Sequence, residues 1–401
     1  MATNNNDKTL NVPPLRFPEF SGEWYSYPLT DFMSFKNGMN PDAKRFGRGI
    51  KFISVMDILN NQFICYDNIR ASVEVIEGDI ETYGVNYGDI LFQRSSETLE
   101  DVGQANVYLD RKPAVFGGFV IRGKSKGNYH PVFFRYLLAS PTARKRIIVK
   151  GAGAQHFNIG QDGLSRVCLN IPSIQEQEKI AKLFECVDTR IATQNKIIEK
   201  YESLIKGLNN ILLYGTGGKS VCLGDILLER SERSRTNNQH EVLSSTVKGI
   251  FSQREYFSKD IASENNVGYK IIRLHDVVLS PQNLWMGNIN YNDRFEIGIV
   301  SPSYKVFSIA DGYDNQFVAA MLKTHRALYS YMMVSEQGAS IVRRNLNMEA
   351  FSQLVFKIPS LDKQREIGCA ISLLKSQLKT ANKLIRAYTS QKQYLLRQMF
   401  I

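Results

Sequence analysis

The sequence lacks the marks of a membrane protein and of a disulfide-stabilised one. No apolar run in its 401 residues approaches the roughly 18 that a membrane-spanning helix requires. The five cysteines are odd in number and show no Cys-x-x-Cys spacing, so they predict reduced, buried thiols and no disulfide or zinc site. Residues 1–8 are polar and rich in asparagine, unlike a signal peptide. We therefore expect a soluble, cytoplasmic protein with no membrane partner.

Apolar residues and positive charge are both plentiful. Hydrophobic residues make up 43% of the chain and aromatic residues 11%, which is enough for packed cores and argues against wholesale disorder. A chain of 401 residues exceeds one ordinary core and predicts two or more domains. The formal net charge is +11 and the pI is about 9.2, as expected of a protein that binds nucleic acid.

One helix-like segment occurs twice, 187 residues apart. The first copy opens at Ile171-Pro172-Ser173 and the second at Ile358-Pro359-Ser360. Without a gap, the copies share Gln177 and Gln364, Ile180 and Ile367, Thr193 and Thr380, Asn195-Lys196 and Asn382-Lys383, and Tyr201 and Tyr388. A solenoid repeat recurs every 20 to 50 residues, so this period is too long for one. It predicts a duplicated domain that is followed by a duplicated helix.

Each copy has apolar residues at alternating spacings of four and three, the heptad pattern of a coiled coil. We call these positions the seam. In the first copy they are Ile180, Phe184, Val187, Ile191, Gln194, Ile198, Tyr201, Ile205, Leu208 and Leu212. In the second copy they are Ile367, Ile371, Leu374, Leu378, Ala381, Ile385, Tyr388, Lys392, Leu395 and Met399. A helix of some 40 residues forms a rod of roughly 60 Å.

The seams predict that the two helices pair with each other. A single amphipathic helix of this length would leave its seam in water, and the other copy is the most available partner. If a pseudo-two-fold axis relates the copies, the helices are antiparallel. In the alternative, each helix packs on its own globular domain. At the start of the first helix, Ser173 and Glu176 have the spacing of a capping box.

The globular segments predict mixed α and β structure. In the first, residues 50–56, 89–92 and 115–121 have the composition of strands, and residues 130–149 that of one helix opened by Pro131. The expected fold class is α+β, with two globular α/β domains related by pseudo-two-fold symmetry and separated by two long antiparallel coiled-coil helices. The expected parts are a flexible N-terminus (1–14), the first head (15–170), the first long helix (171–214), the second head (215–357) and the second long helix (358–401).

The long helices share many residues, whereas the heads share few. Between the heads, Asp89–Phe92 aligns with Asp276–Leu279, Gly151-Ala152 with Gly338-Ala339, and Asn158-Ile159 with Asn345-Leu346. This contrast indicates one structural demand on the helices and a separate demand on each head. In a basic protein it predicts that two domains recognise two different half-sites on double-stranded DNA at a fixed spacing. The expected target is bipartite and asymmetric.

These motifs, taken in order, resemble the specificity subunit of bacterial Type I restriction-modification systems. The likeness covers essentially the whole chain. It rests on the opening Val12–Phe20 with Gly22-Glu23-Trp24 and Leu29, on each Ile-Pro-Ser followed by Gln177 and Ile180 or by Gln364 and Ile367, and on the motifs Gly151–Ile159 and Gly338–Leu346.

The resemblance implies a bacterial, non-catalytic subunit with two target-recognition domains. Its long helices would form the spacer and dock two methyltransferase (M) subunits, and two restriction/translocase (R) subunits would join the complex. This chain would bind no cofactor, while S-adenosylmethionine for adenine-N6 methylation, ATP and Mg²⁺ would belong to the partners. The residues expected for docking are the seam positions Ile180, Phe184, Val187, Ile191, Ile198, Tyr201, Ile367, Ile371, Leu374, Leu378, Ile385 and Tyr388.

The chain shows no motif for catalysis of its own. The Pro13-Pro14 string lacks the spacing and the aromatic residue of an adenine methyltransferase motif. Gly218-Lys219-Ser220 resembles the end of a phosphate-binding loop, but the earlier glycine of that motif is replaced by Leu213. Asp42 and Lys44 form a nuclease-like fragment without a second carboxylate cluster, so a turn is the better interpretation. We expect no catalytic residue and no metal site.

Polar residues on equivalent loops are the candidate DNA contacts. Base recognition requires Arg, Gln, Asn, Ser or Thr at loop positions that can enter a groove, and phosphate contacts require Lys, Arg or backbone amides. Ordinary loop drift or solvated surface charge would produce the same picture. The candidates in the first half are Lys44, Arg45, Arg48, Gln93, Arg94, Ser95, Gln155 and His156. Those in the second half are Arg230, Arg233, Arg235, Ser280, Gln282, Asn283, Arg343, Arg344 and Asn345.

A coiled-coil scaffold with two protein-binding heads is the alternative function. It predicts DNA affinity that is weak and insensitive to salt, whereas phosphate contacts impose a steep salt dependence.

Overall fold

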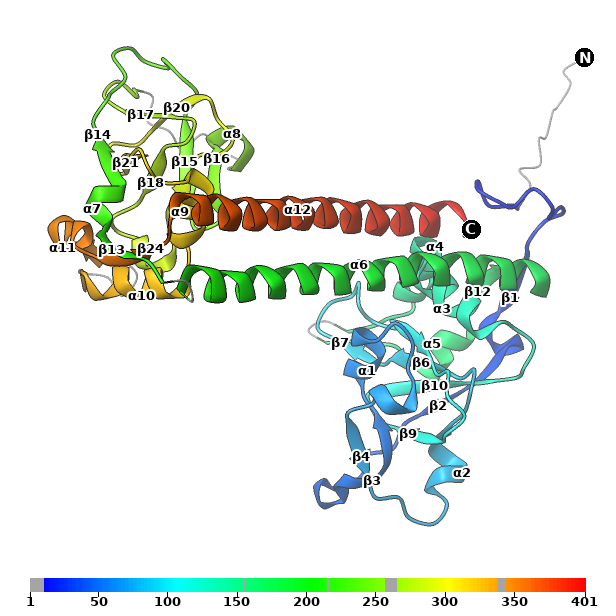
Figure 1. The fold of residues 1–401 in the computed structure, drawn as a ribbon. Coiled ribbons are helices and arrows are strands. Elements are labelled where there is room, and N and C mark those ends of the chain that lie inside the picture. The colour runs from blue at the N-terminus through cyan, green and yellow to red at the C-terminus, as the bar shows by residue number, and fades with distance from the viewer. Residues whose placement is uncertain (1–10, 154–155, 215–216, 257–264, 338–343) are drawn as a thin grey trace, which may run out of the picture. The chain divides into compact units, whose positions relative to one another are not determined.

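The computed structural model of the protein describes residues 11–153, 156–214, 217–256, 265–337 and 344–401 (Figure 1). Its contacts divide the chain into two compact units. Unit 1 comprises Met1–Gln194 with Leu384–Ile401, and unit 2 comprises Asn195–Lys383. The division falls inside both long helices, so each unit contains one head and a part of each helix.

Short strands form the sheets of unit 1. They are β1 (Tyr25–Pro28), β2 (Met33–Asn37), β3 (Phe46–Ile53), β4 (Ala71–Val73), β5 (Gly84–Val85), β6 (Ile90–Gln93), β7 (Ser95–Ser96), β8 (Ala105–Val107), β9 (Ala114–Phe116), β10 (Val120–Ser125), β11 (Phe157–Asn158) and β12 (Cys168–Ile171). One antiparallel sheet has the order β2-β10-β6-β8, and a second sheet, with β3 and β9 parallel, has the order β4-β3-β9-β5. β1 pairs with β12, and β7 with β11.

The helices of the first head are short. They are η1 (Leu29–Asp31), η2 (Ala43–Arg45), α1 (Val55–Asn60), η3 (Tyr66–Asn68), α2 (Asp79–Tyr83), α3 (Pro131–Ala139), α4 (Pro141–Ile148) and α5 (Gln161–Ser165). The largest core cluster of unit 1 joins the sheet through Phe92, helix α3 through Phe133 and the N-terminal segment through Trp24. It also includes Phe184 and Phe400, which belong to the long helical segments.

The expected single helix at residues 130–149 is two helices, α3 and α4. Pro141 has no backbone N–H and cannot continue the first helix. Instead it occupies the first turn of α4, where an N–H is not needed. Ser140 caps this helix because its Oγ accepts a hydrogen bond from Ala143 N at 3.2 Å. The single-helix prediction was therefore wrong at Ser140-Pro141.

Two expected strands are also interrupted. Residues 115–121 form β9 and β10, which are separated by the turn Gly117-Gly118-Phe119. The strand expected at 50–56 ends at Ile53, and Ser54 then begins α1, with its backbone N–H donating to the Asp57 carboxylate at 2.7 Å. The strand expected at 89–92 is confirmed as β6.

Unit 2 repeats much of this plan. Its strands are β13 (Lys219–Cys222), β14 (Leu227–Arg230), β15 (Leu243–Thr246), β16 (Gly249–Ser252), β17 (Lys270–Arg273), β18 (Val277–Leu279), β19 (Ile289–Tyr291), β20 (Ile297–Val300), β21 (Lys305–Ile309), β22 (Ser335–Gln337), β23 (Arg344–Leu346) and β24 (Val355–Ile358). The antiparallel sheet β14-β21-β18-β19 has the strand order of β2-β10-β6-β8, and the pair β13 and β24 corresponds to β1 and β12. The duplication seen in the helices therefore extends to the frame of the heads.

The helices of unit 2 follow the same correspondence. They are α7 (Leu223–Ile226), α8 (Gln253–Tyr256), η4 (Leu284–Met286), α9 (Asn315–Met321), α10 (His325–Met333) and α11 (Met348–Ser352). α9 and α10 precede the second long helix as α3 and α4 precede the first, and α11 occupies the place of α5. β15 with β16 and β17 with β20 form separate two-stranded ladders in this head.

The long helices are α6 (Ile174–Tyr214) and α12 (Leu361–Gln398), each drawn in Figure 1 as one uninterrupted helix. A glutamine one turn into each helix makes the same two hydrogen bonds. Gln177 donates to Pro172 O and accepts from His130 N, both at 3.0 Å. Gln364 donates to Pro359 O and accepts from Asp314 N, again at 3.0 Å. The shared glutamine thus ties each helix start to the helix of its own head that begins next to it.

The expected capping box at Ser173 is only half formed. Ser173 Oγ accepts from Glu176 N at 3.4 Å. The Glu176 carboxylate, however, is 1% exposed and accepts from Arg16 Nε at 2.8 Å and from Trp24 Nε1 at 3.3 Å. Its charge is neutralised by the N-terminal segment, so it does not close the box on the Ser173 backbone.

The seam is buried at the expected spacing, and its first turns pack on the helix's own head. Ile180 and Phe184 belong to the core cluster of unit 1, and Ile367 and Ile371 to that of unit 2. The alternative in which each helix packs on its own domain therefore holds for these turns. These side chains and that of Val187 are at most 5% exposed, so they contribute to the cores of the units, and their docking role stays a prediction.

Within unit 1 the long helices are antiparallel. Leu395 and Met399, near the end of α12, share a core cluster with Phe184, near the start of α6. Lys392 is the charged seam position, and its Nζ lies 2.6 Å from Asp188 Oδ1 of α6. An antiparallel pair is the arrangement that brings these ends of the two helices together.

Two further observations concern the described residues as a whole. None of their helices is both long enough and apolar enough to cross a membrane. The cysteines are free thiols, but the expectation of burial was wrong, since Cys168, Cys186 and Cys369 are exposed.

Candidate nucleic-acid interface

The loop after β6 and the segment before α5 form one surface in unit 1. Ser95 and Ser96 of β7 pair with Asn158 and Phe157 of β11, and Ile159 N donates to Arg94 O at 2.9 Å. Segments that are more than sixty residues apart are therefore joined by backbone hydrogen bonds. The structure brings Arg94 and Ser95 together with the motif that contains His156.

The side chains on this surface differ in what they can offer to DNA. Gln93 is only 5% exposed, and its amide donates to Ser95 O at 2.9 Å, so Gln93 supports the loop instead of contacting a base. Ser95 Oγ donates to Asn158 Oδ1 at 2.5 Å and is half-buried. His156 is exposed, and Gln155 lies outside the described residues.

Arg94 is held at the edge of the turn that separates β9 from β10. Its backbone N–H donates to Phe119 O at 2.9 Å, and its guanidinium Nη1 donates to Gly118 O at 3.3 Å. One weak hydrogen bond leaves most of the guanidinium donors available, because the group carries five N–H donors. Arg94 is thus positioned by the fold and can still bind a phosphate or a guanine edge.

The basic cluster Lys44, Arg45 and Arg48 divides into anchored and exposed groups. Arg45 donates to Glu74 O at 2.8 Å and pairs with Asp79, so it joins η2 to the segment between β4 and α2. Backbone hydrogen bonding from Ile76, with Arg45 contributing, lowers the pKa of Asp79. Lys44 is exposed, and Arg48 pairs with Glu74 at 2.7 Å with its side chain 71% exposed. Such a surface pair is weak and can exchange for a phosphate contact.

Unit 2 has a corresponding junction after β18. Arg344 N donates to Gln282 O at 3.1 Å, which joins β23 to the loop Ser280–Trp285. The Arg344 guanidinium lies over the Trp285 ring, 5.1 Å from its centroid. Gln282 and Asn345 are exposed, while Ser280 and Asn283 are half-buried.

The remaining candidates of unit 2 have mixed placements. Arg230 lies at the end of β14, 3.1 Å from the buried Asp276 carboxylate, and therefore stabilises the sheet. Arg233 is exposed and donates to Gly268 O at 2.9 Å, and Arg235 is exposed. Arg343 lies outside the described residues.

The two junctions share a backbone frame and differ in side chains. In each unit, the segment before the long helix is hydrogen-bonded to the loop that follows a central strand of the equivalent sheet, β6 or β18. Arg94, Ser95 and His156 occupy the first junction, and Gln282 and Arg344 the second. The same frame can therefore present two different sets of hydrogen-bonding groups.

Two exposed apolar residues that line one pocket, Phe119 next to Arg94 and Met56 on α1, were not among the sequence candidates. Phe119 is 69% exposed in the turn whose carbonyl oxygens bind Arg94, and Met56 on α1 is 59% exposed. The glycines before Phe119 were the available signal, because Gly-Gly inside an apolar run indicates a turn. Among the described residues, no group of three or more His, Cys, Asp or Glu side chains could hold a metal ion.

Two α+β heads that present different polar loops in equivalent places are the architecture expected of a protein that recognises two different sites. Residues 21–203 match the family model of the Type I restriction modification DNA specificity domain. This segment is therefore similar to DNA specificity domains of that type, and the resemblance to specificity subunits is confirmed. The match runs from the residues before β1 into the second half of α6.

Two curated proteins are similar in sequence. One is described as the type I restriction enzyme MjaX specificity subunit of Methanocaldococcus jannaschii, 24% identical over 206 residues, which is 50% of this chain and 48% of that protein. The other is the type I restriction enzyme EcoKI specificity subunit of Escherichia coli K12, 24% identical over 181 residues, or 43% of this chain and 38% of that protein. The alignments span about half of these relatives' length or less.

Solved structures share the fold over nearly the whole chain. The S subunit of the Type I restriction-modification system of M. genitalium superposes with a TM-score of 0.59 at 14% identity, covering 97% of this chain and 99% of that one. A chain from a structural study of assembly and conformational transition in the type I R-M system gives 0.51 at 12% identity, covering 93% and 96%. At these identities the likeness concerns the fold alone.

Proposed function

We propose that this chain is the DNA specificity subunit of a Type I restriction-modification complex and that it recognises a bipartite, asymmetric DNA target. The observation that carries the proposal is the repeated junction: the same backbone frame occurs in both units, with different polar side chains. If each junction contacts one half-site, the two half-sites differ in sequence because the side chains differ. The net charge of +11 supports contact with the phosphate backbone.

For the first half-site we propose five DNA contacts, made by Arg94, Ser95, His156, Lys44 and Arg48. They are exposed or half-buried residues on or near the loop surface of unit 1. We assign Gln93 and Arg45 to the support of these loops. For the second half-site we propose Arg233, Arg235, Ser280, Gln282, Asn283, Arg344 and Asn345, with Arg230 as a support of the sheet.

A docking surface for methyltransferase subunits requires exposed apolar residues on the long helices. The buried turns of the seam do not supply such residues. Ile197 on α6 and Leu384 on α12 are 38% and 40% exposed and lie 187 residues apart, at equivalent positions of the repeat. Two equivalent surfaces suit two copies of one partner. We therefore propose that M subunits dock around these residues, that two R subunits join the complex, and that S-adenosylmethionine, ATP and Mg²⁺ are bound by those partners.

The decisive experiment is co-expression of this chain with the genes that neighbour its own gene in the genome, followed by mapping of methylated adenines. We expect methylation within a two-part sequence whose halves differ and are separated by a constant number of unspecified bases. The chain purified alone should neither methylate nor cut DNA. Methylation of a contiguous or palindromic site, or none in the presence of an active partner, would overturn the proposal.

A further inference from the structure

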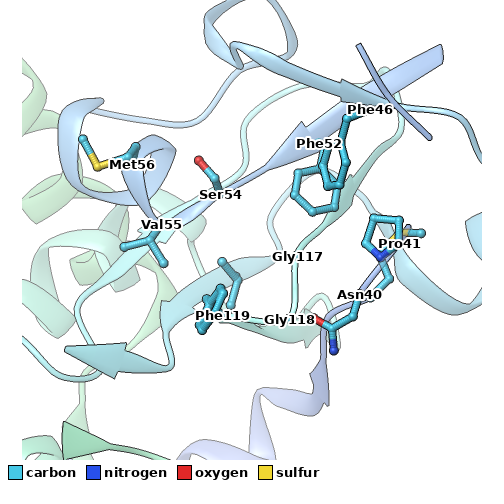
Figure 2. A pocket seen from close by; sticks show the side chains of 12 residues that line it. Asn40, Pro41, Phe46, Phe52, Ser54, Val55, Met56, Gly117, Gly118 and Phe119 are labelled. Atoms are coloured by element: carbon cyan, nitrogen blue, oxygen red, sulfur yellow. The ribbon is translucent and has the colours of Figure 1, made fainter. Parts of the chain in front are cut away.

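A cavity of about 380 Å³ opens in unit 1 beside the Arg94 loop (Figure 2). Phe46 and Phe52 of β3 lie on one side of it, and the main chain of Gly117-Gly118 with Phe119 lies on another (Figure 2). Val55 and Met56 of α1 line the wall beside Ser54. Most of the lining is apolar, as in sites that bind small flat molecules.

A side chain on either glycine of the cavity wall would displace a neighbouring side chain. A Cβ atom on Gly117 would lie 2.7 Å from Cζ of Phe52, and a Cβ on Gly118 would lie 2.0 Å from the Asn40 amide oxygen. Phe46 and Phe52 meet edge to face, with ring centroids 5.1 Å apart. The backbone of the turn can therefore approach an aromatic wall closely.

A few polar groups accompany the apolar walls. The exposed Asn40 amide offers both a donor and an acceptor. Ser54 Oγ donates to the Asp57 carboxylate at 2.7 Å and accepts from the Asp57 backbone N–H in a capping box, which leaves one lone pair to accept. Flat aromatic walls with a small number of hydrogen-bonding groups at the edge match a heterocyclic base, which has two apolar faces and a polar edge.

The charge at the mouth distinguishes a nucleic-acid base from other flat ligands. Arg94 is hydrogen-bonded to the carbonyl oxygens of Gly118 and Phe119, which belong to the lining. Arg48 is exposed on β3, the strand that carries Phe46 and Phe52. A ligand whose base enters the cavity would place its phosphates near these cations. A neutral apolar segment of a partner protein would gain nothing from them.

We propose that this cavity binds a nucleobase that has been turned out of the DNA duplex in the first half-site. The inference rests on the proposed function and deepens it. The apolar walls would stack on the base, Asn40 and Ser54 would contact its edge, and the exposed Phe119 would lie where the duplex opens. Aromatic side chains commonly fill the space where bases are unstacked.

The second unit has different residues at the corresponding turn. Ile121 pairs with Phe92 in β10 and β6, as Lys305 pairs with Leu279 in β21 and β18. Counting back from these pairs, Ser301-Pro302-Ser303 occupy the place of Gly117-Gly118-Phe119. We therefore expect the first unit to hold an extruded base in the first half-site and the second unit to hold none.

The test replaces the pairing partner of each target base in turn by an abasic residue, once the target sequence is known. Extrusion costs a few kcal/mol of pairing and stacking, and an abasic partner removes part of that cost. The methyltransferase partner itself extrudes the adenines that it methylates, so abasic residues opposite those adenines should tighten binding in any case. For the complex of this chain with that partner, we expect binding to tighten about tenfold at one further position, in the first half-site. At the other positions binding should stay equal or weaken.

Two variants connect that position to the cavity. Met56→Trp should fill the cavity from its exposed rim and abolish the tenfold gain, and Phe119→Ala should reduce it. Leu59→Trp is the matched control, since Leu59 lies on the same helix, is 41% exposed and is not in the lining. The control should keep the gain.

The outcomes separate this inference from the proposed function. If the complex binds its target specifically and no abasic position other than those opposite the methylated adenines tightens binding, the cavity does not hold a base, while the specificity function stands. If Met56→Trp leaves DNA binding unchanged and weakens a protein–protein contact, the occupant is a protein segment and the inference is wrong. If the complex shows no sequence-specific binding at all, the proposed function itself fails.

Discussion

Asp188 on α6 is the carboxylate at which the first head and both long helices of unit 1 meet. Its Oδ1 lies 2.6 Å from Lys392 Nζ of α12, and its Oδ2 accepts from Tyr136 Oη at 2.8 Å and from Gln62 Nε2 at 3.3 Å. Desolvation first, and then the Asp188 charge, raise the pKa of Tyr136, so this phenol remains a donor throughout the physiological range. We predict that the Asp188–Lys392 pair couples α12 to α6.

The burial of the two side chains sets the loss of unfolding free energy that we expect when the pair is broken. The Asp188 side chain is 7% exposed and that of Lys392 is 29% exposed. Removal of one member of a fully buried pair costs about 3–5 kcal/mol. Because Lys392 retains partial access to water, we expect Asp188→Asn to lower the free energy of unfolding of unit 1 by about 2–3 kcal/mol and Lys392→Met by about 1–2 kcal/mol.

A double-mutant cycle isolates the coupling between the two side chains. With Lys392 replaced by Met, the Asp188→Asn change no longer leaves an unpaired ammonium, so the coupling free energy should be about 1–2 kcal/mol. Urea unfolding can be followed through Trp24, which lies in the core of unit 1 with its ring centroid 6.4 Å from that of Phe400. A Trp285→Phe background leaves Trp24 as the remaining tryptophan.

The control cycle uses the exposed pair Asp162 and Arg166 of the same unit. Their side chains are 82% and 66% exposed at a separation of 2.8 Å, so water screens the attraction and the coupling should be close to zero. If the losses of Asp188→Asn and Lys392→Met add within about 0.5 kcal/mol in the double variant, the two side chains are independent. That result would refute the role assigned to the pair.

Further predictions concern DNA recognition and pH. Arg94→Ala should weaken target binding by about 1–3 kcal/mol in a filter or fluorescence assay without lowering stability, whereas an unchanged methylation pattern would contradict this contact. Lys44→Ala should lower the slope of log K against log salt by about one, equally for all sequences. Exchange of residues 15–170 for those of a relative should alter only one half of the mapped site. Burial raises the pKa of Asp89, so the native state binds its proton more readily than the unfolded chain. Wild-type stability relative to Asp89→Asn should therefore rise as pH falls from neutrality towards 4 in urea unfolding, and a constant difference would contradict the assignment.

Periodicity explains why the long helices could be predicted and the details of the heads could not. A heptad seam needs only local spacing, and Ile180, Ile367 and Met399 are buried as that spacing requires. The break between α3 and α4 was also encoded locally, in Ser140-Pro141, but the apolar residues on either side suggested one continuous helix.

The spacing of residues in the sequence does not show which acidic residue pairs with which basic residue in the folded chain. Arg45 and Arg230 belong to basic stretches of the sequence, yet each is engaged by an acid distant in the chain, Asp79 or Asp276. The same reason applies to Gln93, whose inward orientation follows from the position of β6 in the sheet. A run of arginines therefore indicates a candidate surface, but only the tertiary fold separates supports from free contacts.

The shared glutamines explain how two heads can diverge on one helical frame. Gln177 and Gln364 each bind a helix start to the first residues of a neighbouring helix through main-chain atoms, His130 N in one unit and Asp314 N in the other. Because the bonds use main-chain atoms of the head, substitutions in the recognition loops leave this attachment unchanged. On the proposed function, changes at Arg94 or Gln282 would therefore alter what a head recognises while the head keeps its orientation on its own helix. This separation of attachment from recognition is what a protein needs if its target sequence is to change one half at a time.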